Sequence, residues 1–361
     1  MSEQNTIEQG GEPAAADNRR PDRPITAIAG FWRRFAALAV DSVLLGVFGL
    51  LIGAVFYEQL AVLGFRGRIV GFVIALLYFG VLNSRLGGGR TLGKRLLRIR
   101  VVGAEGAGIG LARASLRYLV LAIAWFLNGV PVDSDAFSTD SVPQMALTVA
   151  CAVSVFGLAV AITYLAIFNR RTRQSLHDLL VGSYVVTDAD GAPPSIPLWR
   201  GHWLVVLLIL LISMAIPFGV RRLSQTPAFA AMMQVQRAVA REPGVSEVSI
   251  QTGTAARILP KDDAPPQHSL SITARSTVRD DPERLAQRIA NRALDSQPEV
   301  AALNLIGVHI YYGYDIGIAR QITAYSLVQT PLQWRQRIDT DAPEPDSDVE
   351  TAPPSEPAKQ D

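Results

Sequence analysis

The stretch from Phe35 to Phe56 reads FAALAVDSVLLGVFGLLIGAVF and contains one charged residue, Asp41. A helix needs about 20 predominantly apolar residues to cross the roughly 30 Å hydrocarbon core of a bilayer. The stretch therefore predicts a membrane-spanning helix. The composition agrees, because 49% of the 361 residues are hydrophobic and only 18% are charged, which argues against a wholly soluble protein.

Four more apolar runs follow, at residues 69–82, 118–132, 145–168 and 203–220. The last of them is flanked by Trp199 and His202 and has Trp203 at its edge, as is typical of an aromatic belt at a membrane interface. We predict about five transmembrane helices, at 35–56 and at these four positions. Residues 25–187 would form a four-span domain, and residues 188–222 a linker with the fifth helix.

Basic residues are concentrated in alternate connections. The connection between the second and third runs contains eight Lys or Arg residues, whereas the one after the third run contains three Asp and no basic residue. Because Lys and Arg are retained on the cytoplasmic side during insertion, the N-terminus should be cytoplasmic and the region after residue 222 extracytoplasmic. Only three of the 34 basic residues are lysines, a bias that suggests a bacterial gene and therefore a multi-pass protein of the plasma (inner) membrane.

The remaining segments have other compositions. Residues 1–24 and 340–361 are polar and rich in Pro and charge, which predicts disordered tails. Residues 223–339 resemble a soluble domain, with patterns typical of helix, strand, strand, helix, strand, strand. The last two strand-like runs are residues 302–312 and 316–328. The predicted fold class is an all-α polytopic membrane module with an appended small α+β soluble domain.

Asp41 is the most informative ionisable residue, because a carboxylate at the centre of a membrane helix costs roughly 2.5–3.5 kcal/mol on insertion scales. Arg34 precedes it by seven residues and lies within about 20° of the same helical stripe. The two side chains could reach each other or a third group between them. Two interpretations stay open, a structural ion pair and a site for a proton or a small cation.

Two polar segments accompany these residues. Gly88 to Lys94 resembles the start of a P-loop, but Arg95 stands where a Ser or Thr should bind Mg²⁺, so we expect a cytoplasmic turn that touches anionic lipid. The second segment follows the fourth span and contains His177, which can titrate near neutral pH, and Asp178. A single cysteine, Cys151, excludes intrachain disulfides and multi-thiolate metal sites. We expect no metal, no cofactor and, at a net charge of +2, no nucleic-acid partner.

These segments together resemble the RDD family of membrane proteins, which is named for one arginine and two aspartates. The resemblance covers about residues 25–187, and it identifies the named positions as Arg34, Asp41 and Asp178. The central block of the resemblance is a cytoplasmic motif made by Gly89, Thr91, Gly93 and Lys94. The family has largely unassigned activities, and some members are associated with sodium/proton antiport.

The resemblance implies transport of small cations in exchange for protons, at a charge cluster of Arg34, Asp41, His177 and Asp178. A complete path would require a homo-oligomer, since the spans are few and no repeated halves are visible. The alternative is a membrane-anchored scaffold whose external domain binds an envelope protein. We do not expect an enzyme, because no nucleophile, base and orienting group can be placed together. The only partner common to both hypotheses is the lipid bilayer.

Overall fold

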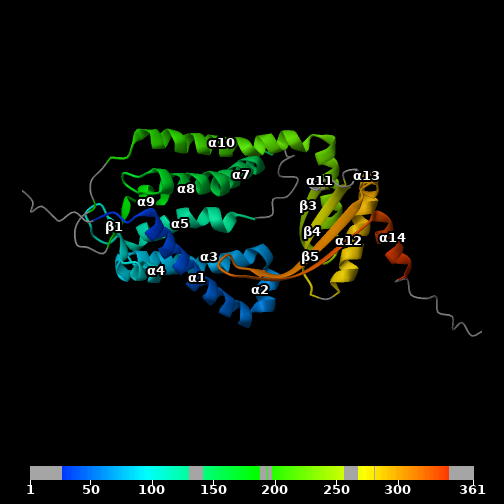
Figure 1. Ribbon diagram of the computed structural model, residues 1–361, viewed down its shortest axis with the longest axis horizontal. Helices are drawn as coiled ribbons and strands as arrows, with labels where there is room; N and C mark the ends of the chain where they lie inside the picture. The colour runs from blue at the N-terminus through cyan, green and yellow to red at the C-terminus, as the bar shows by residue number, and fades with distance from the viewer. Residues whose placement is uncertain are drawn as a thin grey trace, which may run out of the picture.

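The computed structural model describes residues 27–129, 141–187, 193, 197–255, 267–279 and 281–340. It consists of a helical part and an α+β part, which lie at opposite ends of the molecule (Figure 1). The predictions for residues 1–24 and for 341–361 lie outside the described residues. So do most of the predicted linker before the fifth helix and the end of the predicted third span.

The helical part begins at residue 31 and ends at residue 224. Most of its helices run along the long axis of the molecule (Figure 1). In chain order its elements are α1 (Phe31–Val55), α2 (Tyr57–Leu63), η1 (Gly64–Arg66), α3 (Gly67–Asn83), η2 (Arg85–Gly87), α4 (Leu92–Leu96), β1 (Ile99–Gly103), α5 (Leu111–Leu127), α7 (Val142–Ala152), η3 (Val153–Gly157), α8 (Leu158–Phe168), α9 (Leu176–Val181), β2 (Ser183–Thr187) and α10 (Arg200–Ser224).

Within the described residues, four helical segments are long and apolar enough to cross a membrane: Phe31–Val55, Tyr57–Asn83, Val142–Phe168 and Arg200–Ser224. These segments include the first, second, fourth and fifth predicted spans. The predicted third span corresponds to α5, which has 17 residues and begins at Leu111, seven residues before the predicted start. The count of five spans therefore stays a prediction.

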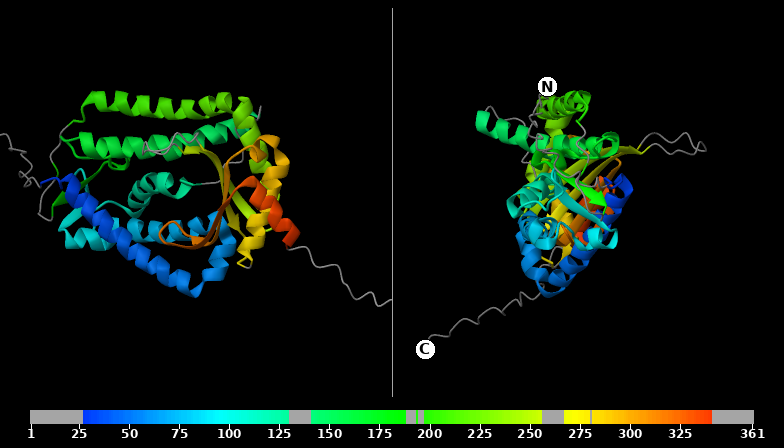
Figure 2. Two further views of the ribbon diagram at one scale, coloured as in Figure 1. Left: turned by 45° about the vertical axis from the view of Figure 1, so that its right-hand side comes forward. Right: turned by 90° about the vertical axis from the view of Figure 1, so that its left-hand side faces the viewer.

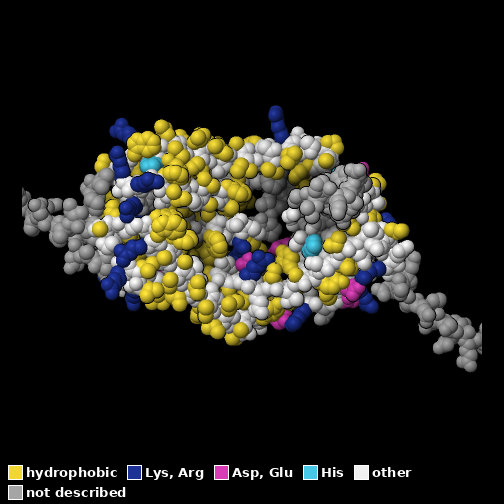
Figure 3. Space-filling view, viewed as in Figure 1, with side chains coloured by type: hydrophobic (Ala, Val, Ile, Leu, Met, Phe, Trp, Pro, Cys, Tyr) yellow, Lys and Arg dark blue, Asp and Glu magenta, His cyan; other side chains and the backbone are white. Residues whose placement is uncertain are grey.

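The end of the helical part that is farthest from the α+β part is polar. Here β1 and β2 pair antiparallel, and Ile28 forms an isolated bridge with Val186, so three distant segments meet. Lys and Arg side chains gather at this end, while hydrophobic side chains cover much of the visible helix surface (Figure 3). This distribution is the one that a membrane protein with one basic interface requires.

The α+β part contains one four-stranded sheet with helices packed against it. The strand order is β3-β4-β5-β6, in which the central β4–β5 pair is parallel and the two outer pairs are antiparallel. Its elements are α11 (Pro227–Ala240), β3 (Val245–Ala255), β4 (Gln267–Ser276), α12 (Pro282–Ser296), α13 (Pro298–Ala301), β5 (Leu305–Asp315), β6 (Arg320–Gln329) and α14 (Pro331–Thr340).

This part follows the predicted order of two helices and four strands and adds α13 and α14, which the sequence patterns did not reveal. The core lies between the sheet and α11, α12 and α14, where Ile272 and Ile289 are fully buried. Trp334 of α14 is also fully buried and donates its indole N–H to the Ile306 carbonyl at 3.0 Å. A buried Trp with a satisfied N–H fixes α14 to the sheet.

The turn between β5 and β6 leaves the α+β part and inserts between α1, α3 and α5. Residues 316–319, predicted as part of a strand, form this turn (Figure 2). Ile316 is fully buried against the helical part, and Trp125 of α5 donates to the Gly317 carbonyl at 2.9 Å. Arg68 at the start of α3 forms an ion pair with Asp315 at 2.8 Å. The two parts of the molecule are therefore joined by packing as well as by the chain.

Candidate functional site

A cavity of about 720 Å³ lies at the polar end of the helical part, between α1, α5, α8 and α9. We call it the charged cavity. Its lining contains six basic and two acidic side chains, namely Arg33, Arg34, Lys94, Arg117, Arg170, Arg173, Asp41 and Asp178. The lining also contains His177. The chain thus brings the named arginine and both named aspartates to one cavity, from segments up to 144 residues apart.

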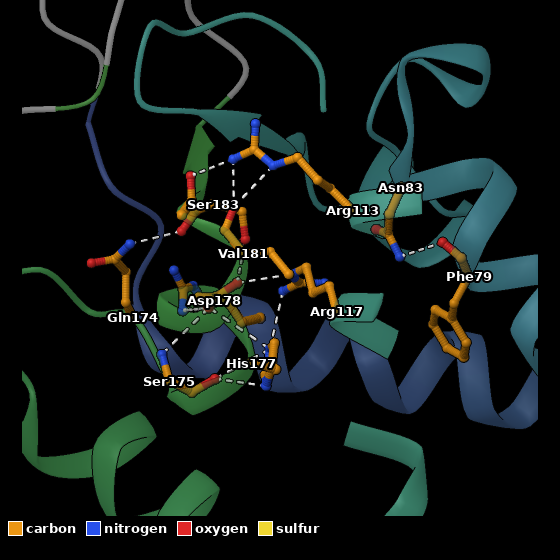
Figure 4. A network of polar contacts seen from close by, with 12 residues as sticks. Phe79, Asn83, Arg113, Arg117, Gln174, Ser175, His177, Asp178, Val181 and Ser183 are labelled. Carbon is orange, nitrogen blue, oxygen red and sulfur yellow. Dashed lines mark hydrogen bonds and ion pairs between the residues drawn. The ribbon is translucent and has the colours of Figure 1, made fainter. Parts of the chain in front are cut away.

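Asp178, in the first turn of α9, is completely buried and joins several segments. It accepts hydrogen bonds from Arg117 Nε at 2.8 Å and from the Ser183 hydroxyl at 3.1 Å (Figure 4). It also accepts one from Arg34 Nη1 at 3.3 Å. Burial alone would raise the pKa of this carboxyl, but the guanidinium groups of Arg117 and Arg34 hold the pKa well below its usual range. Asp178 is therefore a permanent anion between two permanent cations.

His177 is held in one neutral tautomer. Arg117 Nη2 can only donate a hydrogen bond, so His177 Nε2, 3.1 Å away, must accept it (Figure 4). The proton is then on Nδ1, which lies 2.8 Å from the Ser175 hydroxyl oxygen. Burial and the neighbouring Arg117 lower the pKa of His177 to about 3. The expected titration of His177 near neutral pH is therefore wrong, because charging the imidazole would require a desolvated cation beside two guanidinium groups.

Asp41 anchors α1 to the motif made by Gly89, Thr91, Gly93 and Lys94. Its carboxylate accepts hydrogen bonds from the Tyr78 hydroxyl at 2.7 Å, from the Thr91 hydroxyl at 2.5 Å and from the Gly93 N–H at 2.7 Å. A Cβ atom at Gly93 would lie 2.2 Å from the Ala37 carbonyl oxygen, so only glycine permits this close approach. The motif residues Thr91 and Gly93 thus donate hydrogen bonds that hold the carboxylate of Asp41 in place.

The other two motif residues have different roles. Gly89 has a φ of +70°. Its carbonyl oxygen accepts a hydrogen bond from the Val101 N–H of β1 at 2.8 Å. Lys94 is buried, lines the charged cavity and donates from Nζ to the Asn83 side-chain oxygen at 2.6 Å. Burial, with repulsion from Arg117, lowers the pKa of Lys94 to about 7. The motif therefore builds the turn and places in the cavity one amine that is only partly charged near neutral pH.

The structure separates two residues that the helical stripe suggested as partners. Arg34 forms an ion pair with Asp178, and Asp41 is held by neutral donors. Arg117, which sequence reasoning did not select, is central to the site. The signal for it was an arginine directly before an apolar run, and the early start of α5 places it inside the helix rather than in the preceding loop.

A second cavity of about 560 Å³ adjoins the charged one, and we call it the apolar cavity. The two cavities share six lining residues: Leu38, Phe79, Tyr118, Leu121, Ile162 and Thr163. The apolar cavity continues between α1, α5 and η3 to the β5–β6 turn, where Gly317 and Ile318 line it. Together the cavities extend from the polar end of the helices to the inserted turn.

Comparisons with known proteins are consistent with these motifs. Residues 28–182 match the model of the RDD family. The chain is also similar to the uncharacterized protein YckC of Bacillus subtilis (strain 168), with 25% identity over 163 residues that cover 45% of this chain and 87% of YckC. No solved structure matches. The matched family region contains Arg34, Asp41 and Asp178 and ends before α10 and the α+β part.

Proposed function

We propose, from the premise that residues 28–182 are an RDD-family region, that this membrane protein transports an anionic solute through the charged and apolar cavities. The observation that carries the proposal is the shared lining of the two cavities, which together follow the helices from the polar end to the β5–β6 turn. Concave sites of about 300–1,000 Å³ are typical of solute binding, and each cavity falls within that range.

The charge of the lining favours an anion. Six basic side chains face two acids, and both acids are already engaged, Asp178 by two arginines and Asp41 by three neutral donors. A transported cation would have to displace these donors from the carboxylates and approach several fixed positive charges. Exchange of small cations for protons, suggested by the resemblance, therefore has less support from the geometry than anion transport.

Transport can be tested with the purified full chain in phosphatidylcholine vesicles, by currents recorded for chloride, phosphate, glutamate and submicellar dodecanesulfonate. We expect at least one anion to give a current well above that of empty vesicles. Arg34→Gln should lower that current roughly tenfold or more, because a charge-assisted hydrogen bond is worth about 1.5–3 kcal/mol. Arg66→Gln, an exposed arginine outside the charged cavity, serves as the matched control.

The same vesicles separate the alternatives. Proton flux driven by Na⁺ or K⁺ with an impermeant anion would instead support cation–proton exchange. Currents equal to those of empty vesicles for every ion would overturn transport and leave the scaffold hypothesis. That hypothesis has one supporting observation, the edge strand β6, which is exposed along most of its length and could pair with a strand of another protein.

The proposal includes a sidedness, with the polar end cytoplasmic and the α+β part extracytoplasmic. The gathering of basic residues at the polar end supports this orientation (Figure 3). In a Cys151→Ser background, we expect Glu299→Cys in the exposed part of α13 to react with a membrane-impermeant maleimide on intact spheroplasts. Reaction only after lysis would reverse the orientation.

A further inference from the structure

The guanidinium group of Arg34 has one edge in use and one edge available. Its Nη1 donates to the Arg173 carbonyl and lies 3.3 Å from Asp178. Its Nε and Nη2 are buried and have no hydrogen-bond partner among the described residues. These two nitrogens share one edge of the planar group, and such an edge donates two parallel hydrogen bonds to a carboxylate. Leaving both donors buried and unpaired is costly, so the edge fits an anionic group.

The two cavities match the two parts of an amphiphile, because the charged cavity can bind a polar head and the apolar cavity a hydrocarbon chain. The head would meet the net positive lining of the charged cavity. Beyond the shared residues the lining becomes apolar, with Leu45, Phe126 and Phe156. Along α1, the eleven residues from Arg34 to Leu45 span about 16 Å. This length is about half of the roughly 30 Å hydrocarbon core, which is the depth of one leaflet's acyl chains.

The charged cavity also has an opening that a lipid could reach. Trp32 and Phe35 of α1 line the cavity and yet are 75% and 54% exposed. Tryptophan side chains such as that of Trp32 are enriched at the interface between headgroups and acyl chains. A molecule dissolved in the adjacent leaflet could therefore enter sideways, with its head remaining near the arginines.

We propose that the two cavities hold one long-chain carboxylate, of the fatty-acid class, with its carboxylate on the free edge of Arg34 and its chain in the apolar cavity. The two free donors of Arg34 match one carboxylate, and the six residues that line both cavities place the apolar cavity next to that head group. This inference rests on the proposed function and names the class of solute that it would carry.

The test uses a diazirine analogue of palmitate as the probe, with the purified full chain in nanodiscs of phosphatidylcholine and mass spectrometry to locate the labelled residues. We expect labelling at the lining of the apolar cavity, and unlabelled palmitate should compete at least tenfold better than hexadecanol. Arg34→Gln should lower the labelling at least tenfold, whereas Arg66→Gln should not change it. Ala159→Phe, which fills the apolar cavity without touching Arg34, should also abolish the labelling, and it provides a second test if Arg34→Gln misfolds.

Several outcomes would overturn the inference. Equal labelling of wild type, Arg34→Gln and Ala159→Phe would identify annular lipid only. Competition by a two-chain anionic phospholipid as strong as that by palmitate would refute a one-chain site, and stronger competition by lysophosphatidate would refute the carboxylate head. Labelling as expected without any current in vesicles would overturn the transport function alone. Currents carried by small anions without specific labelling would overturn this inference alone.

Discussion

Replacing Asp178 with asparagine is expected to destabilise the helical part by about 3–5 kcal/mol, the usual cost of removing one partner from a buried ion pair. The carboxylate is completely buried between Arg117 and Arg34, and its neutralisation would leave two guanidinium groups without a counter-ion. The midpoint of thermal unfolding of the purified protein in detergent should fall markedly. A low yield of folded protein during production would reflect the same loss of stability.

Two further variants test whether the loss of stability comes from the broken ion pair. Asp295→Asn changes an aspartate that is 64% exposed and paired with Arg335 at 3.1 Å, and it should cost no more than about 1 kcal/mol. Asp178→Asn combined with Arg117→Gln removes one uncompensated cation and should be more stable than Asp178→Asn alone. A single Asp178→Asn variant as stable as wild type would show that the ion pair does not hold α1, α5 and α9 together.

Gly71→Ala is expected to displace the β5–β6 turn from the helical part. A Cβ atom at Gly71 of α3 would lie 1.8 Å from the Ile316 carbonyl oxygen, and a backbone atom cannot move aside as a flexible side chain can. Overpacking of this kind typically costs about 1–3 kcal/mol. We expect faster hydrogen–deuterium exchange at residues 314–319 and a lower midpoint of thermal unfolding.

Gly219→Ala provides the matched control, since Gly219 is also a glycine within a long apolar helix, α10, and a Cβ atom there meets nothing within 4 Å. Alanine should therefore be neutral or slightly stabilising at that position. If Gly71→Ala left the exchange of residues 314–319 as slow as in wild type, the turn would not depend on the space that Gly71 provides.

The elements of this fold could largely be predicted from the sequence, because each depends on a local pattern. Apolar runs located the long helices, and alternating residues located the strands. What the patterns missed are features that depend on distant partners. Residues 316–319 were predicted as strand because Ile316 and Ile318 continue the alternation, but in the structure the helical part binds this turn. The glycines of α1 and α3 were the available signal, since small residues permit close backbone approach.

The candidate site likewise combines features that local sequence patterns indicate with features that depend on distant partners. The residues that the motif resemblance named, Arg34 and Asp178 among them, line one cavity. The resemblance could not give their pairing, because the helical stripe placed Asp41 nearest to Arg34, whereas the ion pair joins residues 144 positions apart. The role of Arg117 was also hidden, since a charge-counting argument treats every arginine near a membrane as a topology signal.

The insertion of the β5–β6 turn has a consequence for biosynthesis. Asp41 of α1 finds Thr91 and Gly93 after only about 50 further residues, but Gly49 must await Ala319, 270 residues later. At about 5–20 residues per second, a ribosome needs roughly 15–50 s to cover that distance. The half of α1 that contains Asp41 can thus form its contacts early in synthesis. The half that contains Gly49 can form its contacts only after β5 and β6 have been translated and, in the orientation proposed here, exported. Nascent chains arrested before residue 315 should therefore expose the glycine face of α1 to lipid or to an insertase.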